Sequence, residues 1–210
     1  GAVILMNENI GLFSHRRLLI NYAYKVKLGK GWLNMGVQGG VMNEGFEYDE
    51  LEITDKNDPA FPNSGADGSG ADIGAGVYYY NNGYYLGLSA THLNSPRVYY
   101  SKEGDRAAYL DIKPAFYSIG GCNIRLNNPL LSLQPCFQVA TDGEYTRADI
   151  TLRGTYEYEL SRFFGGVTYS PGTSVTVLLG GMYKQVTIGY AYELFTGGVG
   201  AINGSHDLVV

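Results

Sequence analysis

The chain of 210 residues contains little of what several protein classes depend on. Its two cysteines are too few for a disulfide framework. Charged residues make up 17% of the sequence, below the usual share of about 25%, and no basic run is longer than Arg16-Arg17. This charge pattern argues against a nucleic-acid partner. No stretch approaches the roughly 18 to 20 consecutive apolar residues of a transmembrane helix, so any membrane span must be built from strands.

Glycine and tyrosine, by contrast, are abundant, with 30 and 19 residues. Both are mediocre helix formers, which argues against an ordinary helical enzyme. The hydrophobic fraction of 45% and the net charge of -5 exclude an intrinsically disordered chain. At this length we expect residues 1-210 to form a single domain. Because Gly1 is followed directly by an apolar run without a secretory signal, we interpret the chain as a processed or truncated fragment.

Alternation of apolar and polar side chains is the dominant pattern. Between Val186 and Leu194 every second residue is large and apolar, and the residues between them are small or polar. The pattern recurs over 18-28 and 148-158. Such a period of two is typical of strands, and about 9 to 11 residues suffice for a tilted strand to cross a membrane. The sequence predicts twelve strands, near residues 1-7, 14-28, 32-43, 71-81, 84-93, 107-125, 130-141, 144-159, 163-170, 174-183, 185-194 and 205-210.

The connections between these strands alternate in length. Tight turns are predicted at 29-31, 81-83, 127-129, 160-162 and near Lys184, and the Asn82-Gly83 pair is a strong hairpin signal. The intervening links are generally longer, above all 44-70, 94-106 and 195-204, with short exceptions at 142-143 and 170-173. Short turns on one side and long loops on the other are typical of outer-membrane barrels. We therefore predict an all-β fold, a transmembrane antiparallel up-and-down β-barrel of about 12 strands.

Two soluble folds compete with this prediction. A lipocalin-like barrel or a β-sandwich also has alternating strands, but its apolar face points into a core. Aromatic residues near the predicted strand ends favour lipid contact, because they resemble the interfacial girdles of membrane barrels. These aromatics are Tyr78-Tyr79-Tyr80, Tyr84-Tyr85, Tyr99-Tyr100, Tyr156, Tyr158 and Trp32.

Several segments, in the same order along the chain, resemble the PorP/SprF family of type IX secretion system outer-membrane proteins. They are Asn21-Tyr22-Ala23-Tyr24, Asp55-Lys56-Asn57-Asp58-Pro59-Ala60-Phe61, Gly76-Val77-Tyr78-Tyr79-Tyr80, Tyr84-Tyr85-Leu86-Gly87-Leu88-Ser89, Ile188-Gly189-Tyr190-Ala191-Tyr192-Glu193 and Gly204-Ser205-His206-Asp207-Leu208. Each motif alone is weakly specific, whereas the ordered set is fairly specific. The resemblance implies a further N-terminal stretch with a signal peptide and more strands, and hence a full barrel of roughly 14 strands.

The resemblance also implies a non-enzymatic role in the outer membrane, in the secretion or surface attachment of adhesins and other cargo, sometimes in gliding motility. The implied partners are other components of the secretion machine, cargo with a C-terminal sorting domain, and outer-membrane lipid. Two other functions stay open. The protein could be a stand-alone channel for small solutes, which single-channel conductance would support, or a barrel enzyme that hydrolyses lipid.

Few residues suggest catalysis. Ser205-His206-Asp207 contains the residue types of a hydrolytic triad, but neighbours on a strand point to opposite faces. Ser89 and His92 could form a lipase pair, although Ser89 lacks the Gly-x-Ser-x-Gly elbow. A polar strand end is the simpler interpretation. We therefore predict no catalytic and no cofactor-binding residues.

Acidic residues are dense in the predicted 44-70 loop, where their oxygen atoms could hold Ca²⁺. The spacing does not match an EF-hand, and a solvated acidic loop is the simpler interpretation, so we predict no metal site. The acidic residues are Glu44, Glu47, Asp49, Glu50, Glu52, Asp55, Asp58 and Asp67.

The cysteines and the remaining charges fall on predicted strands. Cys122 and Cys136 flank the turn near 126-129, and we favour two free thiols over a bridge. Charged residues on the face opposite the apolar one could line an aqueous pore or pair into a network, and we favour the network. These residues are Lys25, Lys27, Lys113, Arg147 or Arg153, Asp149, Glu157 and Glu193.

Overall fold

The computed structural model describes residues 1–10, 13–46, 66–99, 109–197 and 204–210 of the chain. Every regular element in these residues is a β-strand, and none of them forms a helix with the length and hydrophobicity needed to cross a membrane. The strands are β1 (Ala2–Ile10), β2 (Phe13–Leu28), β3 (Gly31–Phe46), β4 (Ala66–Tyr80), β5 (Tyr84–Thr91), β6 (Arg97–Tyr99), β7 (Tyr109–Asp111), β8 (Ala115–Cys122), β9 (Ile124–Arg125), β10 (Leu131–Thr141), β11 (Thr146–Tyr158), β12 (Ser161–Ser170), β13 (Ser174–Tyr183), β14 (Val186–Phe195) and β15 (Ser205–Val209).

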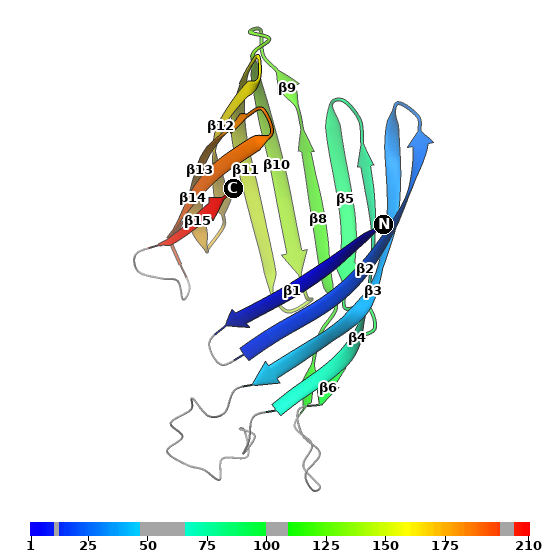
Figure 1. Cartoon of the computed structure of the whole chain (residues 1–210). Coiled ribbons are helices and arrows are strands. Elements are labelled where there is room, and N and C mark those ends of the chain that lie inside the picture. Colours follow the sequence, from blue (N-terminus) through cyan, green and yellow to red (C-terminus); the bar gives the residue numbers. More distant parts are fainter. Residues whose placement is uncertain (11–12, 47–65, 100–108, 198–203) are drawn as a thin grey trace, which may run out of the picture. The chain divides into compact units, whose positions relative to one another are not determined.

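Thirteen strands form one sheet whose order follows the chain (Figure 1). The order is β1-β2-β3-β4-β5-β8-β10-β11-β12-β13-β14-β15, and β9 pairs with β10 beside this path. Neighbours such as β1 and β2, or β13 and β14, are antiparallel. The prediction of an all-β, antiparallel, up-and-down sheet is confirmed, and closure of the sheet into a transmembrane barrel stays a prediction.

The chain divides into two compact units. Unit 1 comprises Gly1–Val26, Asn34–Val77 and Ser89–Phe116. Unit 2 comprises Lys27–Leu33, Tyr78–Leu88 and Tyr117–Val210.

One predicted strand, 107-125, is wrong as a single element. Its first part, β7, pairs with β6 in a separate two-stranded sheet, with Arg97 opposite Asp111 and an Nε–Oδ1 distance of 2.5 Å between them. Strand β6 itself lies within the predicted loop 94-106. The large sheet resumes only at β8, after Pro114, whose nitrogen has no hydrogen to donate to a ladder. One strand of this small sheet therefore lies in the predicted loop and the other in the predicted strand.

Other strands extend beyond their predicted ends. Strand β3 continues to Phe46 and β4 begins at Ala66, so the connection between them is shorter than the predicted loop 44-70. Residues 47–65 lie outside the described residues. The first residues of β4 read Ala-Asp-Gly-Ser-Gly, which has no apolar alternation. Pairing there uses backbone groups, which the side-chain pattern does not report.

Tight turns join the strands at one end, which we call the turn end. Between β4 and β5, Asn81 Oδ1 accepts hydrogen bonds from the backbone N–H groups of Gly83 and Tyr84, at 2.8 and 2.9 Å. The β11–β12 and β13–β14 turns place Glu159 and Lys184 at φ values of 50° and 55°, as two-residue hairpins require. The predicted turns are confirmed, with the one predicted at 160-162 beginning a residue earlier. The opposite end, where β10 joins β11 and β14 joins β15, is the loop end.

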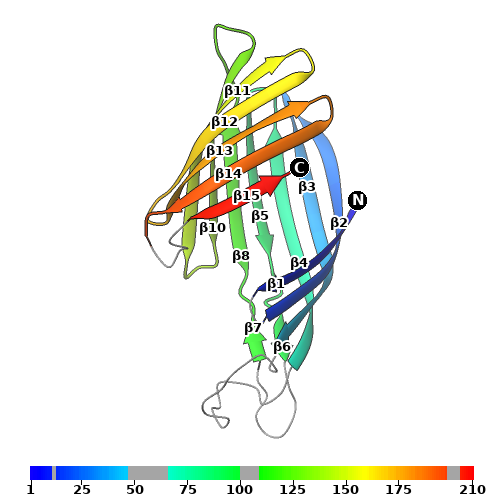
Figure 2. The same cartoon turned by 60° about the vertical axis from the view of Figure 1, so that its left-hand side comes forward.

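The sheet has two chemically different faces. In unit 2, β11 to β15 lie side by side (Figure 2), and the antiparallel register aligns Leu152 with Val167 and Val167 with Val177. These side chains belong to the apolar face, on which Ile150 is 57% exposed. The intervening residues, such as Thr151 opposite Thr168, belong to the polar face. The alternation predicted for 148-158 and 186-194 is confirmed.

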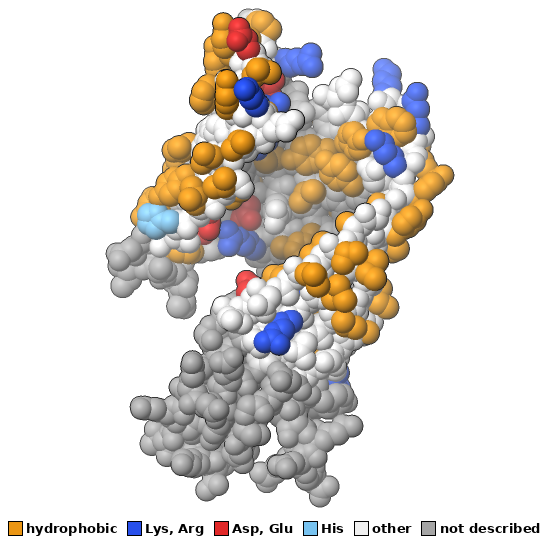
Figure 3. Space-filling view, in the orientation of Figure 1, with side chains coloured by type: hydrophobic (Ala, Val, Ile, Leu, Met, Phe, Trp, Pro, Cys, Tyr) orange, Lys and Arg blue, Asp and Glu red, His pale blue; other side chains and the backbone are white. Residues whose placement is uncertain are grey.

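A hydrophobic core is nearly missing from the described residues. Only Leu19, Met42 and Val98 are buried hydrophobic side chains there. Large apolar side chains are instead exposed, and they gather over β1 and β2 and over β14 and β15 (Figure 3). A lipocalin-like barrel or a sandwich would bury its apolar face, so the exposure argues against both soluble alternatives.

The tyrosine runs divide between the two faces. The ring centroids of Tyr78 and Tyr85 lie 6.0 Å apart, and those of Tyr79 and Tyr84 lie 5.8 Å apart. Consecutive strand residues point to opposite sides, so only one pair can share the apolar face. Tyr85 belongs to the polar side, because its ring stands beside Gly121 and Cys136. The prediction of lipid contact is therefore wrong for Tyr78 and Tyr85, and it stays a prediction for Tyr79 and Tyr84.

Candidate functional site

Charge in unit 2 is segregated by strand end. The loop-end charged residues are Asp142, Glu144, Arg147, Asp149, Glu193 and Asp207. The turn-end charged residues are Lys27, Lys30, Arg125, Arg153, Glu157, Glu159, Arg162 and Lys184. Acidic groups therefore dominate the loop end and basic groups the turn end. Summed charges of one sign favour ligands of the opposite sign at each end.

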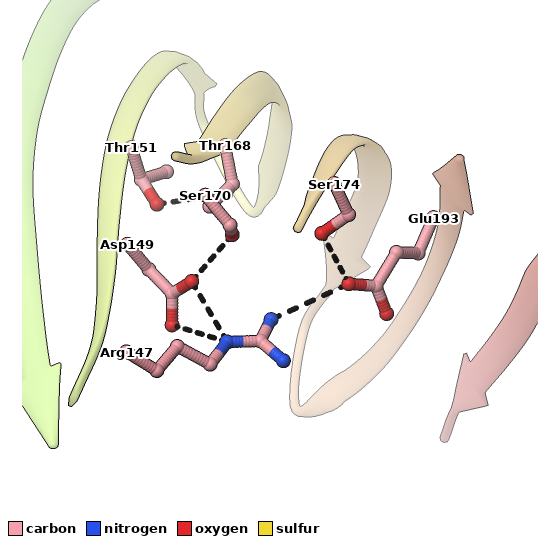
Figure 4. Close-up of polar contacts among 7 residues, drawn as sticks. All are labelled: Arg147, Asp149, Thr151, Thr168, Ser170, Ser174 and Glu193. Atoms are coloured by element: carbon pink, nitrogen blue, oxygen red, sulfur yellow. Dashed lines mark hydrogen bonds and ion pairs between the residues drawn. The ribbon is translucent and has the colours of Figure 1, made fainter. Parts of the chain in front are cut away.

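A polar network ties the strands together at the loop end (Figure 4). Arg147 Nε donates to Asp149 Oδ1 at 3.0 Å, and Arg147 Nη2 donates to Glu193 Oε1 at 3.3 Å. Ser174 Oγ donates to the same Glu193 oxygen at 2.5 Å, and Ser170 Oγ donates to Asp149. One guanidinium thus bridges two carboxylates, and each carboxylate receives a serine hydroxyl.

The register explains why these residues meet. Ser170 and Ser174 are paired across the short β12–β13 connection, and both are fully buried. A buried hydroxyl without a partner is costly, which Asp149 and Glu193 prevent by accepting from them. Arg147 is 50% exposed, so its remaining donors face solvent. The paired network predicted for the polar face is confirmed for these residues.

Two histidine–carboxylate pairs lie near the loop ends of the strands of unit 1. His15 Nδ1 contacts Glu44 Oε2, and Arg17 Nη2 lies 3.7 Å from Glu44 Oε1. His92 Nδ1 lies 2.9 Å from Asp72 Oδ1. Both carboxylates are buried, with 3% and 2% of their side chains exposed. Neither pair was predicted, because each joins strands whose register the sequence alone does not report.

The serine–histidine alternative for hydrolysis is only half present. His92 is held by Asp72, as the base of a triad is held by its acid. Ser89 and His92 both belong to the described residues, and Ser89 donates no hydrogen bond to His92. The arrangement thus lacks the contact between nucleophile and base on which the chemistry depends.

Residues 205–207 alternate between the faces, as predicted. His206 is opposite Tyr192, and its Nδ1 lies 2.6 Å from the Tyr190 hydroxyl on the apolar face. Asp207 is opposite Ala191 on the other face. The three residue types in this row therefore do not converge.

The cysteines and acidic groups form neither a disulfide nor a metal site within the described residues. Cys122 and Cys136 are both free thiols, as predicted. A Cβ added to Gly121 would lie 2.8 Å from Cys136 Cβ, so the next residue, Cys122, points away from Cys136. No group of three or more His, Cys, Asp or Glu residues is placed to hold a metal within the described part of the chain. The acidic residues of the predicted 44-70 loop from Glu47 to Asp58 lie outside that part.

The remaining residues that were predicted to lie on the polar face differ in where the structure places them. Arg153 and Glu157 lie on the polar face of β11, where Arg153 Nε donates to Gln134 Oε1 at 2.9 Å. Lys25 and Lys27 lie on one side of β2, opposite its large apolar residues. Lys113 lies between β7 and β8, outside the sheet, so its placement on the polar face was wrong.

A cavity of about 620 Å³ lies at the turn end of the polar face of unit 2. Arg153, Arg162 and Glu157 line it, and Arg162 Nε lies 2.6 Å from Glu157 Oε1. Phe164 also lines it. The sequence does not predict this cavity, because its lining comes from six strands and from the connections between strands.

Comparison with known proteins gives one match. No curated protein and no solved structure matches the chain. The family model described as type IX secretion system membrane protein PorP/SprF matches residues 1–210, which is the whole chain. Members of this family are membrane components of a secretion system, so their partners belong in general to that machine. The resemblance seen in the sequence is confirmed: the chain belongs to the PorP/SprF family of type IX secretion system membrane proteins.

Proposed function

We propose that this protein is a non-enzymatic β-barrel subunit of the type IX secretion system in the outer membrane. In this role it supports the secretion or surface attachment of cargo such as adhesins. The observation that carries the proposal is the exposed apolar face of an antiparallel sheet whose opposite face is polar. An exposed apolar surface that continues over neighbouring strands is typical of contact with a partner or with lipid.

Strand length and hydrogen bonding support a membrane barrel of one domain. Strands β10 to β14 have 10 to 13 residues, enough to cross the bilayer at a tilt. In hydrocarbon every backbone group needs an internal partner, and a closed sheet has no unpaired edge. The short turns then face the periplasm and the longer loops face the cell exterior.

The polar groups support a role without catalysis. The loop-end carboxylates Asp149 and Glu193 are engaged by Arg147 and by serine hydroxyls. His92 is engaged by Asp72, without a nucleophile bonded to it in the described residues. Such paired groups hold strands together, whereas an acid–base catalyst needs an accessible group beside its substrate.

Partner capture tests the proposal directly. The natural protein, carrying a surface tag, is cross-linked in intact cells, purified from outer membranes and analysed by mass spectrometry. We expect other components of the secretion machine and cargo with a C-terminal sorting domain. A tagged unrelated barrel of the same membrane is the control. Recovery of no large partner, together with single-channel conductance of the purified protein, would replace the proposal by a stand-alone channel.

A further inference from the structure

The turn-end cavity of unit 2 is strongly basic. Arg125, Arg153 and Arg162 line it together with one acid, Glu157. Its volume of about 620 Å³ is in the usual range for ligand sites, roughly 300 to 1,000 Å³. The lining belongs to the polar face, because Ser132 is opposite both Arg125 and Thr155 in the register. The cavity is thus separated by the sheet from the apolar face.

Two of the three guanidinium groups are not neutralised by a carboxylate. Arg162 is paired with Glu157, with 2.6 Å between Nε and Oε1. Among the described residues, the guanidinium of Arg153 donates only to the neutral Gln134, through Nε at 2.9 Å and Nη2 at 2.5 Å. The guanidinium group of Arg125 forms no hydrogen bond or ion pair with any other described residue. Planar guanidinium groups bind carboxylates in pairs of charge-assisted hydrogen bonds, so the cavity favours a carboxylate ligand.

An aromatic ring holds one arginine in place. A Cβ added to Gly180 would lie 2.3 Å from Phe164 Cζ, so the ring of Phe164 covers this glycine. The guanidinium carbon of Arg153 lies 6.0 Å from the centre of the same ring. Stacking on an aromatic face orders an arginine side chain before a ligand arrives. The site is therefore organised by the sheet itself.

The three arginines occupy successive rows of the polar face. Arg153 lies in one row of the register, Arg125 in the row of Thr155, and Arg162 in the row of Glu157. These rows are two residues apart along β11, about 6.5 Å each at the usual rise per residue. The arginines belong to three different strands, β9, β11 and β12, so they are also offset across the sheet by about 4.8 Å for each strand between them. Asn82, Asn123 and Asn127 in the lining add amide groups that suit a peptide backbone.

We propose that this cavity binds an acidic segment of another protein through the carboxylates of that segment. Lipid phosphates are less suited to the site, because lipid contacts the opposite face of the sheet. That the segment belongs to another component of the secretion machine, reached from the periplasm, rests on the proposed function. The binding itself depends only on the described cavity.

Peptide binding to the full chain in detergent micelles tests this site. The probe is a fluorescein-labelled peptide in which Glu alternates with Ser, and its matched control has Gln in place of Glu. Fluorescence anisotropy is measured for the natural protein and for Arg125→Gln, Arg153→Gln and Lys184→Gln. Lys184→Gln removes the same charge at the same end but outside the cavity lining. Mobility before and after heating on gels verifies that each variant is folded.

We expect the Glu peptide to bind, the Gln peptide not to bind, and affinity to fall with added salt. Arg125→Gln and Arg153→Gln should each weaken binding about tenfold or more, the usual effect of one lost charge-assisted hydrogen bond. Lys184→Gln should change it about twofold or less, as for an exposed charge. Equal losses in all three variants, or equal affinity of inorganic phosphate with the same residue dependence, would overturn the proposal. If the Glu peptide does not bind but the partner-capture experiment still recovers the secretion machine, this inference is overturned and the proposed function stands.

Discussion

Replacing Leu179 by Arg should destabilise the protein in a bilayer by about 2 to 4 kcal/mol. Leu179 lies on the apolar face of β13, where it is opposite Tyr190 and 56% exposed. The strand runs from Ser174 to Tyr183. At about 3.3 Å per residue and a tilt of about 45°, such a strand spans a membrane band about 25 Å tall. Leu179 is then close to the bilayer midplane, where the cost of a charge is greatest.

The neighbouring residue provides a matched control. Leu178 is opposite Ala191 and points to the polar face, so Leu178→Arg introduces the same side chain into a polar environment. We expect the Leu179 variant to lower the folding equilibrium constant roughly 30- to 1,000-fold, and the Leu178 variant to cost less than about 1 kcal/mol. Urea unfolding in lipid vesicles measures both, with the fluorescence of the single tryptophan, Trp32, as the signal. Equal destabilisation by the two variants would refute the assignment of the faces.

Three further changes test other parts of the structure. Glu193→Leu removes the acceptor of the buried Ser174 hydroxyl and should cost about 1 to 3 kcal/mol in the same unfolding assay. Gly180→Val should destabilise by about 1 to 3 kcal/mol or prevent folding, because its Cβ would overlap the ring of Phe164; an unchanged midpoint would contradict that packing. Replacing residues 47–65 by a short Gly-Ser linker should leave the unfolding midpoint unchanged, since loop length costs little closure entropy. It should reduce surface display of cargo in cells, and undiminished display would assign partner contact to other surfaces.

Several structural features can be predicted from the amino-acid sequence alone. The alternation over 186-194 predicted β14 and its two faces, because successive strand side chains point to opposite sides whatever lies next to the strand. The Asn82-Gly83 pair predicted the β4–β5 turn, which is closed by a hydrogen bond from the Gly83 N–H to the side chain of Asn81. Family membership followed from ordered motifs along the whole chain. These are local properties of the covalent chain or of its motifs.

The interruption of one strand and the faces of the tyrosines were not predicted from the sequence. The hairpin of β6 and β7 was missed because its pairing is a tertiary contact, and Pro114 within an apolar pattern was given too little weight. The whole tyrosine run 78–80 was predicted to contact lipid, although a strand divides it between two faces. This second error came from counting aromatic residues without applying the period of the strand to each one.

Contacts between distant strands depend on register, which no local pattern specifies. Arg147 meets Glu193 across 46 residues of sequence, and His15 meets Glu44 across 29. A shift of one residue in any pairing would move such a side chain to the other face. The same holds for the arginines of the turn-end cavity, which come from separate strands. Local periodicity therefore establishes that this chain forms two-faced strands, whereas the partners of its charges exist only once hydrogen bonding has aligned those strands.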